Sequence, residues 1–386
     1  MKWSAMLLAG LLLWPAGAAA QETDEVFENR VDPTHVFPQV NRTKYGSNMS
    51  MLAVVKRDGT TLSEVSENTI VAVFSGDEIR GKDIIYADQD NMAFVTIYGE
   101  STETLTFKVY WDGVIYDCGG SATFASDGFI GAIDSPYELD ISPVSLADNA
   151  SNTETLTTWN TKTRDVVLTD RTLYKDDAWN TLCLPFDVTL IGSPLDGAEA
   201  RTLESASLSD AGELTLNFGN EVTTLSAGVP YIIKWSAATD LDNPVFRGVT
   251  VKNTSPTAVT STDGKVKFVG QYAPFEIVAN DAVLSENQGH LNEIILLGSG
   301  NTLGYASASR TLHTFRAHFE VPVGSGAVKE FRMNVGGETS IISIDNGQLT
   351  MDNEAGAWYD LSGRKLDGKP AQSGIYIKNG RKIVIK

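Results

Sequence analysis

Runs of β-branched and aromatic residues recur along this chain at short spacing, and Asp-Gly or Asn-Gly pairs lie between many of them. Examples of such pairs are Asp58-Gly59, Asp112-Gly113, Asp127-Gly128, Asp263-Gly264 and Asn379-Gly380. Both residues of such a pair tolerate the positive φ that a two-residue hairpin turn requires. No long run has a helical period. The pattern predicts an all-β fold, built as two tandem immunoglobulin-like β-sandwich domains plus a small C-terminal β unit.

The first domain is expected over residues 21–145, with strands at residues 49–57, 69–75, 92–98, 104–111 and 114–118. One hairpin is specified in detail, because a turn at Asp112-Gly113 pairs Trp111 with Val114. Side chains alternate between the faces of a strand. One face of the hairpin is therefore predicted to join the core through Phe107, Val109, Trp111, Val114, Tyr116 and Cys118.

The polar residues 146–158 are predicted to form a linker, and residues 159–337 to form the second sandwich. Its strands are expected at residues 165–168, 179–186, 213–218, 231–235, 265–271, 293–297 and 312–321. Residues 338–386 are interpreted as a further connection followed by the C-terminal unit. The only cysteines, Cys118 and Cys183, fall in different predicted domains. The sequence leaves open whether they pair or stay as buried thiols.

The N-terminus is typical of an exported protein. Lys2 precedes an apolar run over residues 5–13, and small residues lead up to an expected cleavage between Ala20 and Gln21. This is the tripartite pattern of a secretory signal peptide over residues 1–20. The apolar run is shorter than the roughly 20 residues of a membrane span, so we expect no transmembrane segment.

Charge is distributed unevenly. The 386-residue chain carries a net charge of −19, and removal of the signal peptide with its single lysine leaves −20. Such an excess argues against nucleic acid as a partner, because the phosphates would repel it. Residues 358–386 reverse the sign, with seven Lys or Arg residues against two Asp. This asymmetry indicates that the C-terminal segment has a separate role.

The C-terminal segment contains an aromatic-Asp-Leu-Ser-Gly-Arg pattern at residues 359–364, a Gly-Ile-Tyr-Ile strand at 374–377 and a basic terminal hairpin. In this order they resemble the C-terminal sorting domain of type IX secretion in Gram-negative bacteria, although the unit is shorter than that domain. The resemblance implies a β-sandwich signal read by the export machinery of the outer membrane. The residues that carry it are Trp358, Tyr359, Asp360, Leu361, Gly363, Arg364, Gly374, Ile375, Tyr376, Ile377, Asn379, Gly380 and Lys382.

Three segments of the second domain are similar to a recurring module of large secreted proteins from the same bacteria. They cover residues 179–188, 227–234 and 297–303. The module has no assigned activity, so this resemblance implies location and fold only. The first domain resembles immunoglobulin-like modules of such proteins.

Candidate catalytic and metal-binding residues do not assemble into a motif. His313 and His318 are spaced so that a strand would place them on opposite faces, where they cannot share a metal. Calcium stays open as a weak ligand of two acidic loops, residues 88–91 and 240–243, neither of which has EF-hand spacing. Gly298-Ser-Gly300 lacks the frame of a serine hydrolase, and Cys183 lies within an expected strand. No catalytic residue, metal site or cofactor is therefore predicted.

These observations predict a secreted or surface-attached, non-enzymatic β-sandwich protein that adheres to or binds a protein or a glycan. Two alternatives stay open. One is an accessory carbohydrate-binding protein or divergent glycoside hydrolase, which requires aligned aromatics or a carboxylate pair in a cleft. The other is a structural component of the cell surface or matrix. The sequence does not name the ligand.

Overall fold

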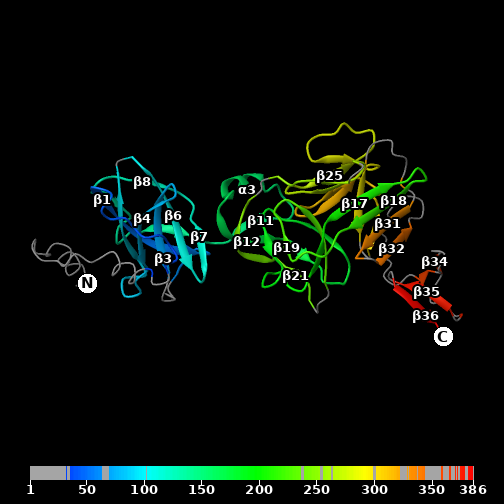
Figure 1. Ribbon diagram of the computed structural model, residues 1–386, viewed down its shortest axis with the longest axis horizontal. Helices are drawn as coiled ribbons and strands as arrows, with labels where there is room; N and C mark the ends of the chain where they lie inside the picture. Colours follow the sequence, from blue (N-terminus) through cyan, green and yellow to red (C-terminus); the bar gives the residue numbers. More distant parts are fainter. Residues whose placement is uncertain are drawn as a thin grey trace, which may run out of the picture. The chain divides into compact units, whose positions relative to one another are not determined.

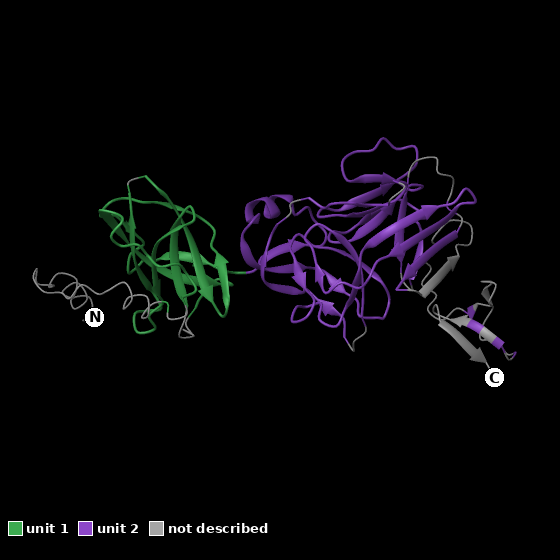
Figure 2. Ribbon diagram, viewed as in Figure 1, with its two compact units in different colours: residues 1–142 green, residues 143–386 purple. Residues whose placement is uncertain are grey.

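The computed structural model describes residues 32, 35–62, 69–100, 102–235, 239–252, 255–261, 264–298, 301–321, 328, 330–336, 338–343, 358–359, 365–366, 370, 372, 374–378 and 381–385. The chain divides into two compact units, residues 1–142 and 143–386 (Figure 2). Strands dominate both units, and the described residues form one helix, α3 (Thr153–Trp159) (Figure 1). The predicted all-β fold is confirmed. Within the described ranges, no helix has the length and apolarity that a membrane span needs.

Unit 1 is a sandwich of two sheets. The first sheet is built around β1 and consists of β1 (Ser47–Arg57), β2 (Thr60–Thr61), β5 (Ala93–Gly99), β9 (Phe129–Ile130) and β10 (Tyr137–Asp140). The second runs in the order β4 (Glu78–Ile84), β3 (Ile70–Ser75), β6 (Thr104–Trp111) and β7 (Val114–Asp117), with β8 (Ala122–Thr123) beside β6. Alternation along both sheets encloses one apolar core, which includes Met51, Val73, Val95, Phe107, Tyr116 and Leu139.

The β6–β7 hairpin has the predicted register. Trp111 pairs with Val114, and Asp112 and Gly113 adopt φ angles of 47° and 84°. The expected core face is confirmed, since Phe107, Val109, Tyr116 and Cys118 are buried and Trp111 and Val114 pack against the same cluster. Its local turn chemistry fixes this register, as expected for a two-residue loop.

The opposite face of the β4–β3–β6–β7 sheet is covered by the segment that precedes β1. Phe37 and Val40 pack there with Ile70 and Phe74. Asp32 anchors the segment, because its carboxylate contacts Lys82 Nζ at 3.0 Å and accepts the N–H groups of residues 36 and 37. Strand β4 escaped prediction because its buried face carries charged side chains, which break the apolar alternation.

Unit 2 consists of several small sheets. Three sheets have three strands each: β11 (Val144–Ala147)–β12 (Thr163–Thr169)–β22 (Val245–Thr250), β14 (Asn180–Cys183)–β20 (Pro230–Lys234)–β16 (Glu199–Arg201) and β26 (Gln288–His290)–β25 (Phe275–Val278)–β29 (Arg310–Leu312). A four-stranded sheet has the order β17 (Leu203–Leu208)–β18 (Glu213–Phe218)–β31 (Glu330–Val335)–β32 (Glu338–Ser343). A five-stranded sheet has the order β23 (Val259–Thr260)–β24 (Lys267–Gly270)–β30 (Ala317–Glu320)–β27 (Ile294–Gly298)–β28 (Thr302–Tyr305). Two-stranded sheets are β13 (Thr172–Leu173)–β21 (Leu241–Asp242) and β15 (Val188–Thr189)–β19 (Thr224–Leu225).

Three apolar cores hold the sheets of unit 2 together: a small one packs β25 against β27, and two larger ones join the other sheets. One gathers residues of β11, β12, β14, β20 and β22, among them Leu146, Leu168, Leu182, Ile233 and Phe246. The other gathers residues of β18, β24, β27, β30 and β31, among them Leu216, Phe268, Ile295, Phe319 and Phe331. Phe268 and Phe319 stack with ring centroids 4.5 Å apart, an arrangement that adds to the burial of their area.

Two expectations for this unit are corrected. Residues 146–158, expected as a linker, contribute the end of β11 and most of α3, and they bury Leu146 and Leu156 in the first core. Long-range pairing of β11 with β12 overrides the local polar composition. The strand expected over residues 312–321 breaks after β29 and resumes as β30, because Phe315 adopts a φ of 56° that ends extended pairing.

The C-terminal segment forms a four-stranded sheet in the order β34 (Lys365–Leu366)–β33 (Trp358–Tyr359)–β35 (Gly374–Lys378)–β36 (Arg381–Ile385). Lys378 pairs with Arg381, as the Asn-Gly turn predicts. Of the residues that carry the sorting resemblance, Asp360, Leu361, Gly363, Arg364, Asn379 and Gly380 lie outside the described residues, as do the expected cleavage residues Ala20 and Gln21.

Both cysteines are buried, and they do not form a disulfide with each other. Cys118 belongs to the core of unit 1 and Cys183 to the first core of unit 2, so the two thiols are buried in separate apolar cores. Burial raises the pKa of the Cys183 thiol to about 12, which keeps the sulfur protonated and unreactive at neutral pH.

Candidate anion-binding site

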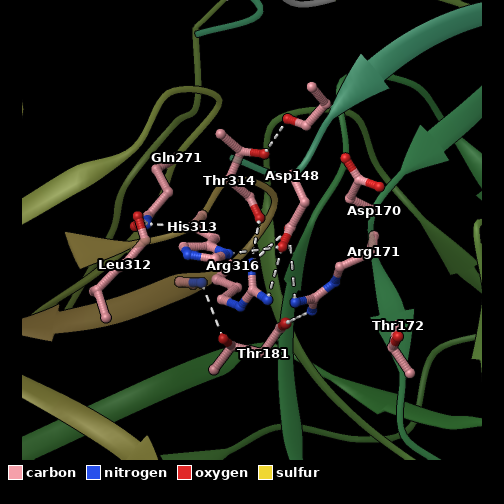
Figure 3. A network of polar contacts seen from close by, with 12 residues as sticks. Asp148, Asp170, Arg171, Thr172, Thr181, Gln271, Leu312, His313, Thr314 and Arg316 are labelled. Carbon is pink, nitrogen blue, oxygen red and sulfur yellow. Dashed lines mark hydrogen bonds and ion pairs between the residues drawn. The ribbon is translucent and has the colours of Figure 1, made fainter. Parts of the chain in front are cut away.

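A buried carboxylate, that of Asp148, organises a polar cluster in unit 2 (Figure 3). Asp148 directly follows β11, and its backbone joins two other segments by donating to Thr169 O at 2.9 Å and accepting from Thr314 N at 2.8 Å. Its side chain is 3% exposed. A carboxylate removed from water to this degree is stable only when cations or hydrogen-bond donors surround it.

Two arginines approach this carboxylate from different parts of the chain. Arg316 makes a forked contact, with Nη1 at 2.6 Å from Oδ1 and Nη2 at 3.1 Å from Oδ2. Arg171, in the turn between β12 and β13, lies with Nη1 3.9 Å from Oδ1 and is itself buried. Forked arginine–carboxylate pairs are the strongest and most directional ion pairs in proteins.

The cluster holds more positive charge and more donors than one carboxylate can satisfy. Arg171 Nε has no hydrogen-bond acceptor among the described residues. Burial, followed by repulsion from Arg316, lowers the pKa of Arg171 to about 9, although Asp148 opposes this shift. Arg171 therefore still carries its charge at neutral pH. Two guanidinium groups facing one carboxylate leave a net positive potential, which extends toward the outer edge of the cluster.

His313 forms that outer edge. Its Nδ1 lies 3.0 Å from Asp148 Oδ2, which fixes the orientation of the ring, while 51% of the side chain remains exposed. An imidazole held through one nitrogen presents the other to a ligand in a defined direction. The exposed fraction thus rises from Asp148 through Arg316, at 29%, to His313.

The loop that carries His313 and Arg316 is fastened to β14 and to the residue that follows β24. Gln271, which follows β24, donates its amide to His313 O at 2.8 Å and accepts the Phe315 N–H at its backbone oxygen, also at 2.8 Å. Thr181 in β14 accepts the Ala317 N–H at 3.0 Å. Phe315, whose φ is 56°, is fully buried. A bulky residue in this region is strained, and such strain concentrates where a site must be held rigidly.

A pocket of about 280 Å³ opens beside the cluster. Its lining combines cationic, hydroxyl and apolar groups from β14, β27, β29, the His313–Arg316 loop and the start of β30: Arg310, His313 and Arg316; Thr181 and Thr311; Leu296, Leu297, Gly298, Leu312 and Ala317. None of these ten residues is acidic. In a chain with a net charge of −19, three cationic or protonatable side chains on one pocket make it a local exception suited to an anion.

The remaining histidines are placed apart from this pocket. His318 lies in β30, fully buried, with Nδ1 3.0 Å from the Gln271 side-chain oxygen and its ring against Phe275. His290 contacts Glu293 Oε1 and Ala282 O, each at 3.0 Å. His35 lies in the segment that precedes β1. His313 and His318 therefore face different partners. The described residues contain no group of three His, Cys, Asp or Glu side chains arranged to hold a metal.

Of the two acidic loops considered for calcium, one uses its carboxylate oxygens in contacts with residues in and just after β13. Asp240 accepts the Lys175 N–H at 2.8 Å, and Asp242 accepts the hydroxyl of Thr172 at 2.5 Å. In the other loop, Asp90 and Asn91 adopt positive φ within the turn closed between Tyr86 and Met92. Positive φ in a tight turn is a conformation that Asp and Asn tolerate well.

Sequence reasoning missed this site entirely. It placed Asp148 in a linker and His313 and Arg316 in a continuous strand, so nothing brought them together. One signal was present, because Arg310, His313 and Arg316 fall within seven residues of an otherwise acidic chain. Asp148 and Arg171 carried no signal, since their roles arise from contacts across as many as 168 positions of the sequence.

Comparison with known proteins finds no match to the chain among family models, curated proteins or solved structures.

Proposed function

We propose that this chain is a non-enzymatic binding protein of the bacterial cell exterior, and that its second unit binds an anionic saccharide in the pocket lined by Arg310, His313 and Arg316. One observation carries the proposal: a cationic pocket is backed by a buried, donor-rich cluster in a strongly acidic chain. A solvated acidic surface needs no such arrangement. A site for a carboxylate or sulfate does, because guanidinium groups bind both in forked geometry.

The rest of the lining favours a sugar as the carrier of the anionic group. Thr181 and Thr311 bring hydroxyls that match the hydroxyls of a saccharide, and leucine side chains from β27 and β29 offer an apolar surface to one face of a ring. A volume of about 280 Å³ accommodates one small residue of a longer chain rather than an extended ligand.

Hydrolysis of such a saccharide is the competing function. One contact favours it, because Asp148 orients His313 in the way that a carboxylate orients a general base. Glycoside hydrolysis, however, commonly uses two carboxyl groups that flank the scissile bond. The pocket lining supplies none, and Asp148 is enclosed by its arginines. The composition of the lining therefore supports binding over hydrolysis.

An array of saccharides printed as matched acidic and neutral pairs tests the proposal. The intact protein should bind members that carry carboxylate or sulfate and not their neutral counterparts. Arg310→Gln should weaken this binding about tenfold, because an exposed guanidinium in a ligand site contributes a charge-assisted hydrogen bond. Arg332→Gln serves as the matched control, since Arg332 lies on β31 outside the pocket. Equal binding to acidic and neutral members would contradict the proposal, and cleavage of any member would support the hydrolase instead.

The proposed location rests on the two ends of the sequence, the signal peptide pattern of residues 1–20 and the sorting-domain resemblance of residues 358–386. We propose that the outer-membrane export machinery of a Gram-negative cell is the partner of the C-terminal unit. Deletion of residues 358–386, followed by fractionation of the cells, tests this. The deleted protein should be retained in the periplasm, and normal export would disprove a sorting role.

A further inference from the structure

His290 lies at the end of β26, beside the loop of residues 279–287 that connects β25 to β26. These two strands pair in parallel, so the loop returns the chain to the start of the sheet. At its middle, Val283 is 92% exposed and Leu284 41% exposed. A loop with so little burial depends on polar contacts for a fixed conformation.

Both ring nitrogens of His290 contact oxygen atoms that only accept hydrogen bonds. Nε2 lies 3.0 Å from the backbone oxygen of Ala282 in the loop, and Nδ1 lies 3.0 Å from Oε1 of Glu293. A backbone carbonyl and an ionised carboxylate have no proton to donate, so each contact needs a proton on the imidazole. A neutral histidine carries one ring proton and an imidazolium carries two. The protonated ring is therefore the form that makes both hydrogen bonds at once.

The charged side chains on the elements around His290 favour this protonated form. Arg310 of β29 pairs with Ile277, so its side chain belongs to the opposite face of the sheet from His290, which pairs with Val278. The Ala282 carbonyl, and after it the Glu293 carboxylate, raises the pKa of His290 above its ordinary 6.5. The charged residues of β25, of the loop and of the turn after β26 are all acidic: Glu276, Asp281, Glu286 and Glu293.

We infer that His290 is a proton-operated latch that holds the loop of residues 279–287 in place, independently of the saccharide pocket. When the ring is protonated, it joins the Ala282 carbonyl to the Glu293 carboxylate. When the ring loses a proton, the remaining N–H stays with the charged acceptor, because that hydrogen bond is the stronger, and the loop is released at Ala282. Because folding raises the pKa of His290, the latch stabilises the folded chain below about pH 6.5, and this contribution is lost as pH rises through the higher folded value.

NMR of the full-length protein, labelled at alanine and leucine methyl groups and in the histidine rings, tests the inference between about pH 5.5 and pH 8.5. The methyl signals of Ala282 and Leu284 should titrate with the same midpoint as the His290 ring, and this midpoint should lie above 6.5. The order parameter of the Ala282 methyl, which follows the backbone, should fall above the midpoint as the loop is released. His290→Gln should abolish the titration of Ala282, because the amide does not change its charge.

Two carboxylates of the same region provide a matched pair of variants. Glu293→Gln should lower the His290 midpoint by about 0.5 to 1 pH unit, because it removes the charge that Nδ1 contacts at 3.0 Å. Glu286→Gln removes an exposed carboxylate of the loop and should shift the midpoint less, because solvent screens exposed charges. A His290 midpoint at or below 6.5, or a titration of Ala282 that persists in His290→Gln, overturns the inference. Equal order parameters of the Ala282 methyl at both ends of the pH range would likewise overturn it.

Discussion

Each unit of this protein buries a carboxylate against basic side chains, and the two arrangements differ in how they meet the solvent. In unit 1, Asp32 and Lys82 are both fully enclosed and form one pair with a separation of 3.0 Å. In unit 2, Asp148 faces Arg171, Arg316 and His313, and exposure of the side chains rises from 3% at Asp148 to 51% at His313.

The difference distinguishes the structural role of the pair in unit 1 from the binding role that we propose for the cluster in unit 2. In unit 1 the carboxylate of Asp32 faces the ammonium group of Lys82, and it also accepts hydrogen bonds from the segment that covers the sheet, so the pair fastens one part of the fold to another. In unit 2 the positive charge exceeds the negative and ends at a pocket. Closed, balanced pairs position the backbone, whereas open, unbalanced clusters retain attraction for a ligand.

The largest effect is expected when the closed pair is broken. Lys82→Met leaves Asp32 buried without its cation and should reduce the free energy of unfolding of unit 1 by about 3–5 kcal/mol. Hydrogen exchange of β3 and β4 in the full-length protein measures this. Lys44→Met, which breaks the exposed pair with Glu78, should have a far smaller effect on stability, because solvent screens exposed ion pairs. Saccharide binding should be unchanged in both variants, and a loss of binding in Lys82→Met would erase the distinction between the two clusters.

The open cluster should show a smaller loss of stability together with a loss of binding. Arg316→Met removes the forked partner of Asp148 and should reduce the free energy of unfolding of unit 2 by about 2–3 kcal/mol, because a buried carboxylate loses its strongest donors. Binding of acidic saccharides should fall more than in Arg310→Gln. Urea unfolding and calorimetric titration report the two quantities separately. If stability falls and binding is retained, the cluster is structural like that of unit 1.

Acid should weaken unit 1 through Asp32. Burial raises the pKa of this carboxyl, but hydrogen bonds from the Phe37 N–H, Lys82 and the Val36 N–H outweigh burial and hold it below its ordinary 3.8. The unfolded state then binds the proton more tightly than the folded state. The stabilisation is present above about pH 4 and is lost as pH falls through the lower folded value. Urea unfolding between pH 5 and pH 2.5 measures this loss, and Asp32→Asn should flatten the dependence.

The smallest change in stability is expected at Arg310. This exposed residue at the rim of the pocket should alter the free energy of unfolding by about 0.5 kcal/mol or less when changed to Gln. The same substitution should still weaken the binding of acidic saccharides, so its effect on ligand recognition can be measured separately from any effect on folding. Parallel thermal melts of Arg310→Gln and Arg332→Gln provide the check. A large shift of the melting temperature in Arg310→Gln alone would mean that Arg310 supports the fold.

Short sequence patterns predicted those parts of the fold that depend on residues close together in the sequence. The β6–β7 hairpin followed from Asp112-Gly113, and the β35–β36 register followed from the Asn-Gly turn, because each pairing closes over two residues. Strand β4 was missed because the charged side chain of Lys82 is buried against Asp32 and Phe37, in a segment distant in sequence. Apolar alternation cannot reveal a strand whose inward charges are neutralised from elsewhere.

The candidate site could not be predicted because it, too, depends on contacts between residues that are distant in the sequence. Its centre, Asp148, is polar in a polar stretch, and it is buried by residues distant in sequence, among them Arg316 and Thr314. The break at Phe315 interrupts a run of residues that was expected to form one strand. Hydrogen bonds from Gln271 and Thr314, which hold the loop in place, become visible only when three strands are assembled.

Calorimetric titration of the full-length protein with an acidic saccharide and with its methyl ester tests the central claim most directly, because esterification removes the charge and keeps the shape of the sugar. The free acid that ranks highest on the array should bind at one site per chain. Its methyl ester should bind at least about tenfold more weakly, since the guanidinium groups lose their ionic partner. Equal affinity of acid and ester would contradict the assignment of the Arg310–His313–Arg316 pocket as an anion site.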